Sequence, residues 1–452
     1  MQATTAVPHP ATDPSRRDRV LRAAVRAGLI GPDHPTAGFL DVDGLLTTVA
    51  DLKAAFGDAP VLHAFAAKST PLVPVLRLLA EAGLGCEVAS PGELALAVAA
   101  GFAPDRIVLD SPVKTRAELA RALALGVAIN ADNLAELARV DALLTAVPSA
   151  SVLGLRLNPQ VGAGTIAAMS TASRTSKFGV PMTDPGARQA VIDAFDAYPW
   201  LTRLHVHVGS QGCPPELITA GVGAAYDLAE EINARAGTRR VTGLDIGGGL
   251  PVDFDGDTMS PSHADYVSWL REAVPGLFDG RYELVTEFGR SVTAKNGFTA
   301  AVVEYVKDVG GRRIALTHAG AHLATRTVFM PDSWPLRVAA YTAEGLPKGT
   351  AELPHDVAGP CCFAGDVVAR DRPLPELAPG DLITLLDTGG YAFTAHWSYN
   401  NVTRPAVHGF TTAGGEVRFT TIRAEQTTAE ILAESGADLA DDLLALEAAP
   451  WR

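Results

Sequence analysis

Lys68 is the residue of this 452-residue chain whose setting points most directly to chemistry. It follows the mainly apolar run at residues 62–67, which predicts a buried strand. Burial disfavours an ammonium, so we expect the pKa of Lys68 to fall. A neutral lysine attacks aldehydes and can form a Schiff base. The alternative is a lysine that extends its ammonium from a strand end into water.

Two further segments have the chemistry of a phosphate site. Gly247, Gly248 and Gly249 follow a short apolar run, and glycines can expose backbone N–H groups at positive φ. Arg290 follows the next apolar run and can hold a phosphate with two N–H groups. The simpler explanations are a tight turn for the glycines and a surface ion pair for the arginine.

A phosphate site, a strand-end lysine and the carboxylate of Glu287 together favour pyridoxal phosphate as a cofactor. Lys68 would form the Schiff base, and Glu287 would keep the pyridine nitrogen protonated so that the ring can accept electrons. An imidazole could stack on the ring face. His205 and His207 are two residues apart and lie on the same side of a strand, so spacing does not decide between them. A structural role is the alternative for either histidine.

Strand-like runs alternate with Ala/Leu/Glu-rich helical stretches before these residues. The runs are at residues 62–67, 85–89, 106–109, 127–130, 152–157, 204–208, 243–246 and 284–286. Eight strands with helical connections predict a (β/α)₈ barrel, in which site residues follow the strands and phosphate sites commonly follow strands seven and eight. An open doubly wound sheet is the alternative, but no dinucleotide glycine fingerprint opens the first unit.

The pattern changes after about residue 296. Strand-like runs at residues 300–309, 313–317, 335–342, 382–386 and 416–422 are separated by turns with little helix. This predicts a second, mostly β domain. We therefore expect an N-terminal segment at residues 1–43, a barrel at 44–298 and a β domain at 299–452.

Composition limits the classes of partner. The chain is 47% apolar and 19% charged, which suits a soluble globular protein, and no apolar run reaches the roughly 18 residues of a membrane span. The net charge of −14 argues against a nucleic-acid partner. The four cysteines have neither disulfide nor zinc spacing, and no metal site is expected. The polar residues 1–19 predict a loose tail and, without a signal-peptide core, a cytoplasmic protein.

With these residues assembled, the chain resembles the fold-type III pyridoxal-phosphate-dependent decarboxylases, the group of diaminopimelate, ornithine and arginine decarboxylases. The resemblance runs from about Gly38 to Pro405. The motifs that carry it are His63-Ala-Phe-Ala-Ala-Lys68, Glu87-Val-Ala-Ser-Pro-Gly-Glu93-Leu, Ser176-Lys-Phe-Gly179, His207-Val-Gly-Ser-Gln211, Asp245-Ile-Gly-Gly-Gly249, Glu287-Phe-Gly-Arg290, Gly359-Pro-Cys-Cys-Phe-Ala-Gly-Asp366 and Gly389-Gly-Tyr391. Each motif is modest alone, but their order and separations are specific.

The resemblance implies roles for individual residues. It places the Schiff base on Lys68 and His207, rather than His205, over the ring. Cys362, or Lys68, would reprotonate Cα, and a small buried apolar role is the alternative for Cys362. The implied cofactor contacts are Lys68, Glu87, His207, Ser210, Gly247, Gly248, Gly249, Glu287, Gly289, Arg290 and Tyr391, with Tyr391 at the phosphate.

The resemblance also implies an architecture. The strand at residues 39–43 would join the β domain of an alanine-racemase-like fold. Two copies would form a head-to-tail homodimer, with Cys362 and Asp366 of one copy at the partner's cofactor.

The chain departs from the family where the far end of the substrate is held. The family's acidic residue after the cysteine is Phe363 here, and an apolar ring cannot pair with a distal ammonium. The family's Arg-Pro-x-x-Tyr becomes Arg326-Thr-Val-Phe-Met330, which keeps the arginine and loses the tyrosine. We therefore expect decarboxylation of an amino acid other than diaminopimelate or ornithine, contacted by Arg326, Met330, Phe363 and Asp366.

Two other functions remain open at this point. One is a racemase or another Cα-carbanion enzyme of the same fold, although the cysteine motif favours decarboxylation. The other is a non-catalytic, decarboxylase-like binding protein, although such a protein has no need of Lys68, Glu287 and Tyr391.

Overall fold

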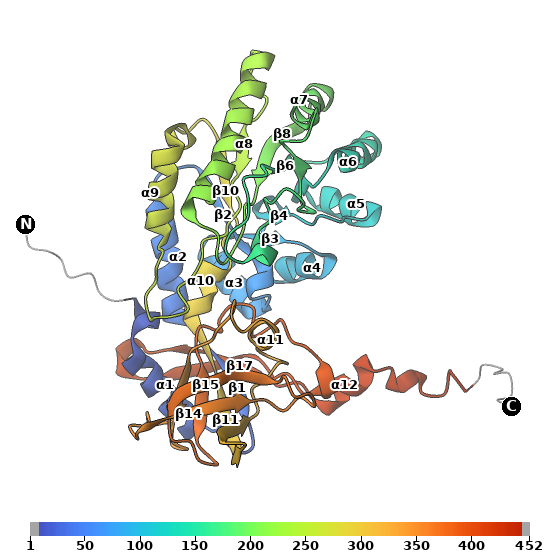
Figure 1. Ribbon diagram of the computed structural model, residues 1–452. Coiled ribbons are helices and arrows are strands. Elements are labelled where there is room, and N and C mark those ends of the chain that lie inside the picture. The colour runs from blue at the N-terminus through green and yellow to red at the C-terminus, as the bar shows by residue number, and fades with distance from the viewer. Residues whose placement is uncertain (1–8, 445–452) are drawn as a thin grey trace, which may run out of the picture. The chain divides into compact units, whose positions relative to one another are not determined.

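The computed structural model describes residues 9–444, which form two compact units (Figure 1). Unit 1 contains residues up to 16, residues 41–297 and residues 387–394. Unit 2 contains residues 17–40, residues 298–386 and those from 395 onward. Residues 1–8 and 445–452, which the predicted N-terminal segment and β domain include, lie outside the described residues.

Unit 1 is built around a closed barrel of parallel strands. The strand order is β5-β4-β3-β2-β10-β9-β8-β6, and pairing of β6 with β5 closes the barrel, while the short β7 pairs with β6. The strands are β2 (Val61–Ala66), β3 (Gly85–Val88), β4 (Ile107–Leu109), β5 (Ala128–Ala131), β6 (Leu153–Asn158), β7 (Val180–Pro181), β8 (Leu201–Val206), β9 (Gly243–Asp245) and β10 (Glu283–Thr286). The predicted (β/α)₈ barrel is confirmed, and each predicted strand run overlaps one of these strands.

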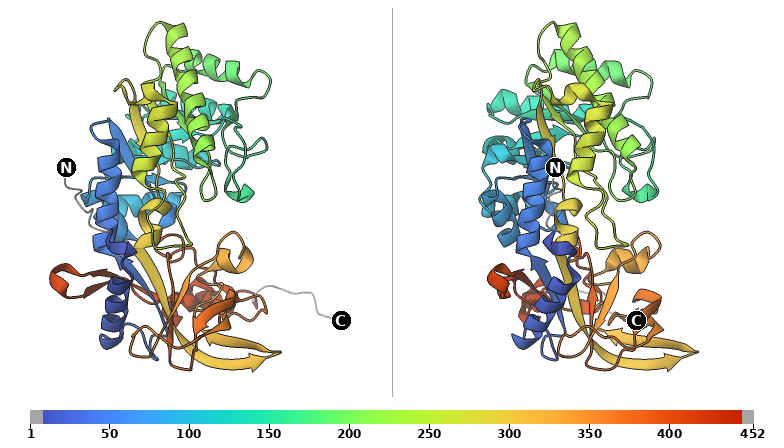
Figure 2. Two further views of the ribbon diagram at one scale, coloured as in Figure 1. Left: turned by 60° about the vertical axis from the view of Figure 1, so that its left-hand side comes forward. Right: turned by 90° about the vertical axis from the view of Figure 1, so that its left-hand side faces the viewer.

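Helices lie outside the barrel strands (Figures 1 and 2). They are α2 (Val42–Phe56), α3 (Val73–Glu81), α4 (Pro91–Ala99), α5 (Arg116–Leu125), α6 (Leu134–Ala146), α7 (Ala187–Ala197), α8 (Pro215–Ala236), α9 (His263–Ala273) and α10 (Arg290–Thr293). Local sequence sets their ends: Thr115 and Glu118 form a capping box on α5, and Gly126 ends it at a φ of 79°. This alternation places the carboxyl ends of all the barrel strands at one rim.

Unit 2 is mostly β. Its sheet has the order β15-β14-β12-β11-β1-β17-β18, with β16 on β11 and β13 on β16. The strands are β1 (Thr36–Asp41), β11 (Gly297–Val309), β12 (Arg312–Thr317), β13 (Val338–Tyr341), β14 (Glu352–Ala358), β15 (Val367–Pro375), β16 (Leu382–Leu385), β17 (Ala406–Thr411) and β18 (Arg418–Arg423). Phe39 of β1 stacks on Phe298 at 5.1 Å in one of its cores. The predicted second domain, with the N-terminal strand in its sheet, is confirmed.

The N-terminal region differs from the predicted loose tail. Residues 14–26 form α1 (Pro14–Arg26), which buries Val20, Leu21 and Ala24. The spacing of these three residues fits one helical face, but the surrounding arginines and prolines hid the pattern. Within the described residues, no helix combines the length and the apolar character that crossing a bilayer requires.

Candidate active site

The rim formed by the carboxyl ends of the barrel strands brings Lys68 and Glu87 together. Lys68 lies in the 3₁₀ turn Ala67–Ser69 after β2, and Glu87 is in the neighbouring strand β3. The parallel register sets Ala66 opposite Glu87. As a result, Lys68 Nζ donates a hydrogen bond of 2.6 Å to Glu87 Oε2. The amine is therefore held at the rim as one half of an ion pair.

This ion pair reverses the expected ionisation of Lys68. The Lys68 side chain is 43% exposed; its partial burial would lower its pKa, but the Glu87 carboxylate raises it above its ordinary value. The prediction of a depressed pKa is wrong, because it considered burial without a carboxylate from the next strand. Burial raises the pKa of Glu87, and Lys68 offsets only part of that rise. Glu87 can thus accept the proton that Lys68 must lose before it attacks an aldehyde.

Gly247, Gly248 and Gly249 follow β9 as a closely packed loop. Gly247 and Gly249 have φ values of 65° and 98°, which favour glycine. A Cβ on Gly248 would overlap the carbonyl oxygen of Glu287. The N–H of Gly247 donates to the carboxylate of Asp245 at 3.1 Å. The loop backbone therefore packs directly against the backbone of Glu287 and leaves no room for a side chain at Gly248.

His207 lies between this loop and Glu287. The N–H of Gly248 donates to His207 Nδ1 at 3.2 Å, so Nδ1 carries no proton and the neutral ring is protonated at Nε2. Burial lowers the pKa of His207 even though Glu287 Oε2 lies 3.6 Å from Nδ1. His207 is therefore a neutral imidazole, suited to cover the face of a bound ring.

Glu287 follows β10 and is buried. Burial would raise the pKa of Glu287, but His205 holds it well below its ordinary value. Its Oε1 atom is also buried and accepts no hydrogen bond from any described residue. A buried, ionised oxygen without a donor is unfavourable. The protonated nitrogen of a pyridine ring would supply the missing donor.

The other predicted cofactor residues of unit 1 lie on the same rim. Arg290 begins α10, and its guanidinium carbon is 4.5 Å from the centre of the Tyr391 ring. Tyr391 has a φ of 67° and donates its N–H to the Ser69 carbonyl at 2.7 Å. A Cβ on Gly289 would lie 3.0 Å from the Cβ of Ser69. Ser210 is half-buried in the loop after β8. The left-handed conformation of Tyr391, a non-glycine residue, marks a constrained position near the lysine.

Unit 2 contains the residues predicted to contact substrate. Cys362 is exposed, and Phe363 follows it. Arg326 lies in α11 (Thr325–Phe329), with its guanidinium carbon 5.1 Å from the centre of a Trp334 ring. Met330, just after this helix, is exposed. Their contacts with a substrate stay predictions.

Asp366 has a structural role in unit 2. Its buried carboxylate accepts the N–H of Ala321 at 2.6 Å and that of Cys361 at 2.7 Å. The carboxylate thereby orders the loop that carries Cys362 and Phe363. These backbone contacts occupy both of its oxygens.

Three buried ionisable residues behind Glu287 are strand-end candidates to which the sequence interpretation assigned no role in cofactor or substrate binding. They are Asp110, which follows β4, Arg156 in β6 and His205 in β8. His205 Nδ1 is 3.2 Å from Asp110, and its Nε2 is 3.7 Å from Glu287. The sequence feature that could have identified them as site residues is their position at or near the carboxyl ends of apolar strands.

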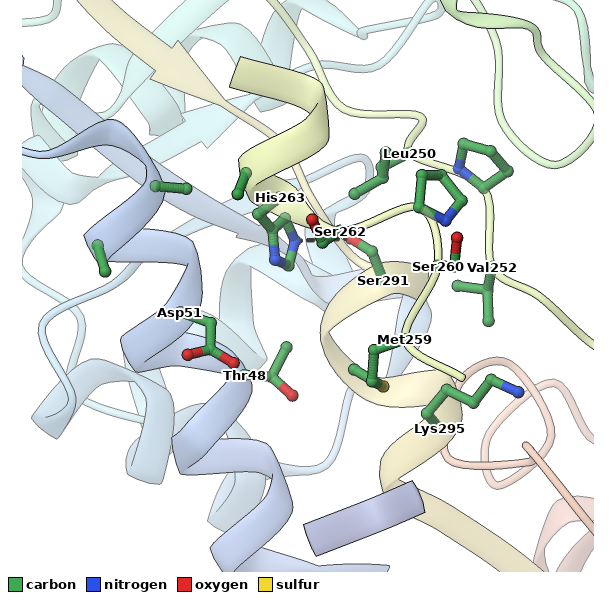
Figure 3. Close-up of a pocket in the computed structure, with 15 residues that line it drawn as sticks. Thr48, Asp51, Leu250, Val252, Met259, Ser260, Ser262, His263, Ser291 and Lys295 are labelled. Carbon is green, nitrogen blue, oxygen red and sulfur yellow. Dashed lines mark hydrogen bonds between the residues drawn. The ribbon is translucent and has the colours of Figure 1, made fainter. Parts of the chain in front are cut away.

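A separate cavity of about 360 Å³ lies on the outer side of the barrel (Figure 3). Its wall includes Leu250, which follows the glycine loop, and Ser291, which follows Arg290. His263 Nε2 lies 3.1 Å from Ser291 Oγ. None of the predicted site residues lines this cavity, so the site described above belongs to the strand-end rim.

The groups on this rim fit pyridoxal phosphate. The glycine loop and Arg290 suit the phosphate, Lys68 the aldehyde carbon, and the unpartnered Oε1 of Glu287 the pyridine nitrogen. Fold and site together define a (β/α)₈-barrel enzyme that uses this cofactor.

Comparison with known proteins agrees. The family model "Pyridoxal-dependent decarboxylase, pyridoxal binding domain" matches residues 43–294. Diaminopimelate decarboxylase of Pseudomonas aeruginosa is 32% identical over 361 residues, 78% of this chain and 83% of that protein. The enzyme of that name from Archaeoglobus fulgidus is 30% identical over 366 residues, 78% of this chain and 82% of that protein. The crystal structure of a Helicobacter pylori diaminopimelate decarboxylase mutant complexed with L-lysine matches 89% of this chain and 97% of its own, with a TM-score of 0.79 and 25% identity.

The chain belongs to the fold-type III pyridoxal-phosphate-dependent decarboxylases. It is an amino-acid decarboxylase, and its cofactor is pyridoxal 5′-phosphate. The family resemblance inferred from the motifs is confirmed.

Proposed function

We propose that this enzyme removes the α-carboxyl group from an amino acid whose side chain is more apolar, or less cationic, than that of diaminopimelate or ornithine. The observation that supports this choice of substrate is the environment of Phe363. This residue belongs to an aromatic cluster in unit 2, defined as Phe329, Phe363, Trp397 and Tyr399.

Phe363 stands where the family has an acidic residue, so this position offers an aromatic ring in place of a carboxylate to a distal ammonium. Phe329 stacks on Phe363 with ring centres 5.7 Å apart, while Trp397 and Tyr399 meet Phe363 edge-on, each at 5.7 Å. A charge-assisted hydrogen bond contributes about 1.5–3 kcal/mol, so losing one disfavours a cationic side chain by about 10- to 150-fold. The relatives named diaminopimelate decarboxylase make that amino acid the competing substrate.

The residues of the rim have separate tasks in this proposal. Lys68 holds the cofactor, and Glu87 accepts or returns a proton at Lys68 Nζ. Glu287 holds the pyridine nitrogen, and His207 covers the ring. When bound, the cofactor supplies an electron sink for the pair left at Cα after CO₂ departs.

We also propose that the enzyme is a homodimer, in which Cys362 acts at the partner's cofactor and returns a proton to Cα. The family resemblance and the exposed position of Cys362 support this assignment. Mixing inactive Lys68→Ala and Cys362→Ala proteins should restore activity, because mixed dimers contain one intact site. Inactive mixtures, or a monomer in sedimentation, would contradict it.

The substrate proposal is tested by CO₂ release from a panel of D- and L-amino acids that includes meso-diaminopimelate, lysine, ornithine and aromatic and aliphatic amino acids. We expect kcat/KM for at least one apolar or neutral amino acid to exceed that for diaminopimelate by tenfold or more. Phe363→Glu should narrow this gap, and Phe363→Leu is the matched control without a charge. Comparable or faster turnover of diaminopimelate by the wild type would refute the substrate proposal. Exchange of the Cα hydrogen without CO₂ would refute decarboxylation itself.

A further inference from the structure

A row of charged groups runs through the barrel interior and ends at Glu287. Arg156 Nη1 lies 3.7 Å from Asp110 Oδ2, Asp110 Oδ1 lies 3.2 Å from His205 Nδ1, and His205 Nε2 lies 3.7 Å from Glu287 Oε2. All four residues are buried, and His205 is fully buried. Cationic and anionic groups alternate along the row, which ends where the pyridine nitrogen would bind.

The barrel register fixes this row. Arg156 of β6 is the register partner of His205 in β8, which is in turn the partner of Asp245 in β9. The carboxylate of Asp245 accepts the side-chain N–H of Asn130 at 2.9 Å and the N–H of Gly247 at 3.1 Å. Three neighbouring strands thus place His205 in a polar layer, and Asp245 of this layer also holds the Gly247–Gly249 loop.

The surroundings of His205 require a positive charge. Neither ring nitrogen makes a hydrogen bond of good geometry to a described residue, yet carboxylates lie on both sides. Burial alone would lower the pKa of His205, but Asp110, Glu287 and Asp245 together raise it to about 10. The pKa of Asp110 falls despite its burial, because His205 and Arg156 stabilise the carboxylate.

We propose that His205 is a positioning residue that acts as an imidazolium on Glu287 and thereby keeps the bound cofactor protonated at its pyridine nitrogen. Glu287 and that nitrogen share one proton. A cation on the far side of Glu287 makes the carboxylate a weaker base, so the proton resides on the nitrogen. Without the cation, the proton moves toward Glu287, and the ring becomes a poorer electron sink. The inference rests on the cofactor and not on which amino acid is decarboxylated.

His205→Gln tests the assignment, because glutamine keeps side-chain N–H groups near both carboxylates but carries no charge. The probe is pyridoxal phosphate labelled with ¹⁵N in the ring, bound to the substrate-free enzyme and observed by NMR. In the wild type we expect the shift of a protonated pyridine at pH 7. In His205→Gln the signal should move toward that of the unprotonated ring, because the pKa of the nitrogen falls by about one unit or more.

His263→Gln is the matched control. His263 is also buried in unit 1, but it lies against Ser291 and burial lowers its pKa to about 3. This substitution should leave the ¹⁵N shift unchanged. If His205→Gln fails to bind cofactor, Asp110→Asn provides the test, since it weakens the charge on His205 and should move the signal in the same direction.

Activity gives a second measurement. With a favoured substrate, kcat of His205→Gln should fall about tenfold or more, while the affinity for the cofactor changes less, because Glu287 still bonds to the nitrogen. A ¹⁵N signal that stays at the wild-type position in the cofactor-loaded variant, or an unprotonated ring in the wild type, would overturn the inference. Since the NMR measurement contains no substrate, an error in the substrate proposal would not affect it.

Discussion

Replacing Glu87 by glutamine should lower the pKa of Lys68. The two side chains meet at 2.6 Å between Nζ and Oε2. At that distance, Coulomb's law gives about 6 kcal/mol at an effective dielectric constant of 20 and about 1.6 kcal/mol in water. The Lys68 side chain is 43% exposed, so screening favours the smaller figure. We therefore expect the pKa of Lys68 to fall by about one to two units in Glu87→Gln.

Competitive labelling of the cofactor-free protein with acetic anhydride measures this change. Only the neutral amine reacts, so mass spectrometry of the Lys68 peptide across a pH series gives the labelling midpoint. The midpoint of Glu87→Gln should lie lower than that of the wild type by about one unit or more. At a fixed pH near neutrality, Lys68 of the variant should label about tenfold faster.

Glu93, in the first turn of α4, supplies a control close to Glu87 in the sequence. Glu93 accepts the N–H of Ala89 at 2.8 Å and forms no ion pair with Lys68. Glu93→Gln should therefore leave the midpoint of Lys68 where it is. A midpoint that is unchanged or higher in Glu87→Gln would refute the view that this carboxylate controls the ionisation of the lysine.

Three further predictions concern cofactor binding at Gly248 and the free energy of unfolding at Asp366 and His263. Gly248→Ala should weaken cofactor binding in an absorbance titration, because its Cβ would overlap the Glu287 carbonyl, and wild-type affinity would contradict this. Asp366→Asn should lower the free energy of urea unfolding by about 2–4 kcal/mol, because it weakens two charge-assisted backbone hydrogen bonds, and an unchanged urea midpoint would count against it. Burial lowers the pKa of His263 to about 3, so the free energy of unfolding should fall by about 1.4 kcal/mol per pH unit as pH drops from about 6.5 toward 3. His263→Gln should lack this pH dependence when urea unfolding is measured across the pH series. The same dependence of unfolding free energy on pH in the variant and the wild type would disprove the prediction.

The barrel could be predicted from sequence because its signals are local. Each parallel strand is a short apolar run followed by a helix, and Lys68, Gly247 and Arg290 mark the ends of three such units. The strands of unit 2 were harder to predict from the sequence. β14 (Glu352–Ala358) and β15 (Val367–Pro375) were not predicted, since Pro354 and the charged residues of β15 interrupt the alternation of apolar and polar side chains.

The ionisation of the site could not be read from sequence, because it depends on contacts between distant strands. Lys68 has a raised pKa because β3 brings Glu87 beside it. His205 meets Asp110 only because the barrel closes, although 94 residues separate them in the chain. Spacing along a single strand identifies which side a residue faces, but not the charge that it meets there.

The polar layer of Arg156, His205 and Asp245 also affects how the protein persists in a cell. Barrel interiors of this type usually pack branched apolar side chains, and replacing buried ionic groups by such side chains often stabilises a protein by about 1–4 kcal/mol. This barrel is therefore less stable than one with an apolar interior at these positions. A cofactor that binds only the native state adds about 2.7 kcal/mol when its free concentration is about 100 times its dissociation constant. A shortage of the vitamin-derived cofactor should thus reduce the amount of this protein, through unfolding and proteolysis, as well as its turnover.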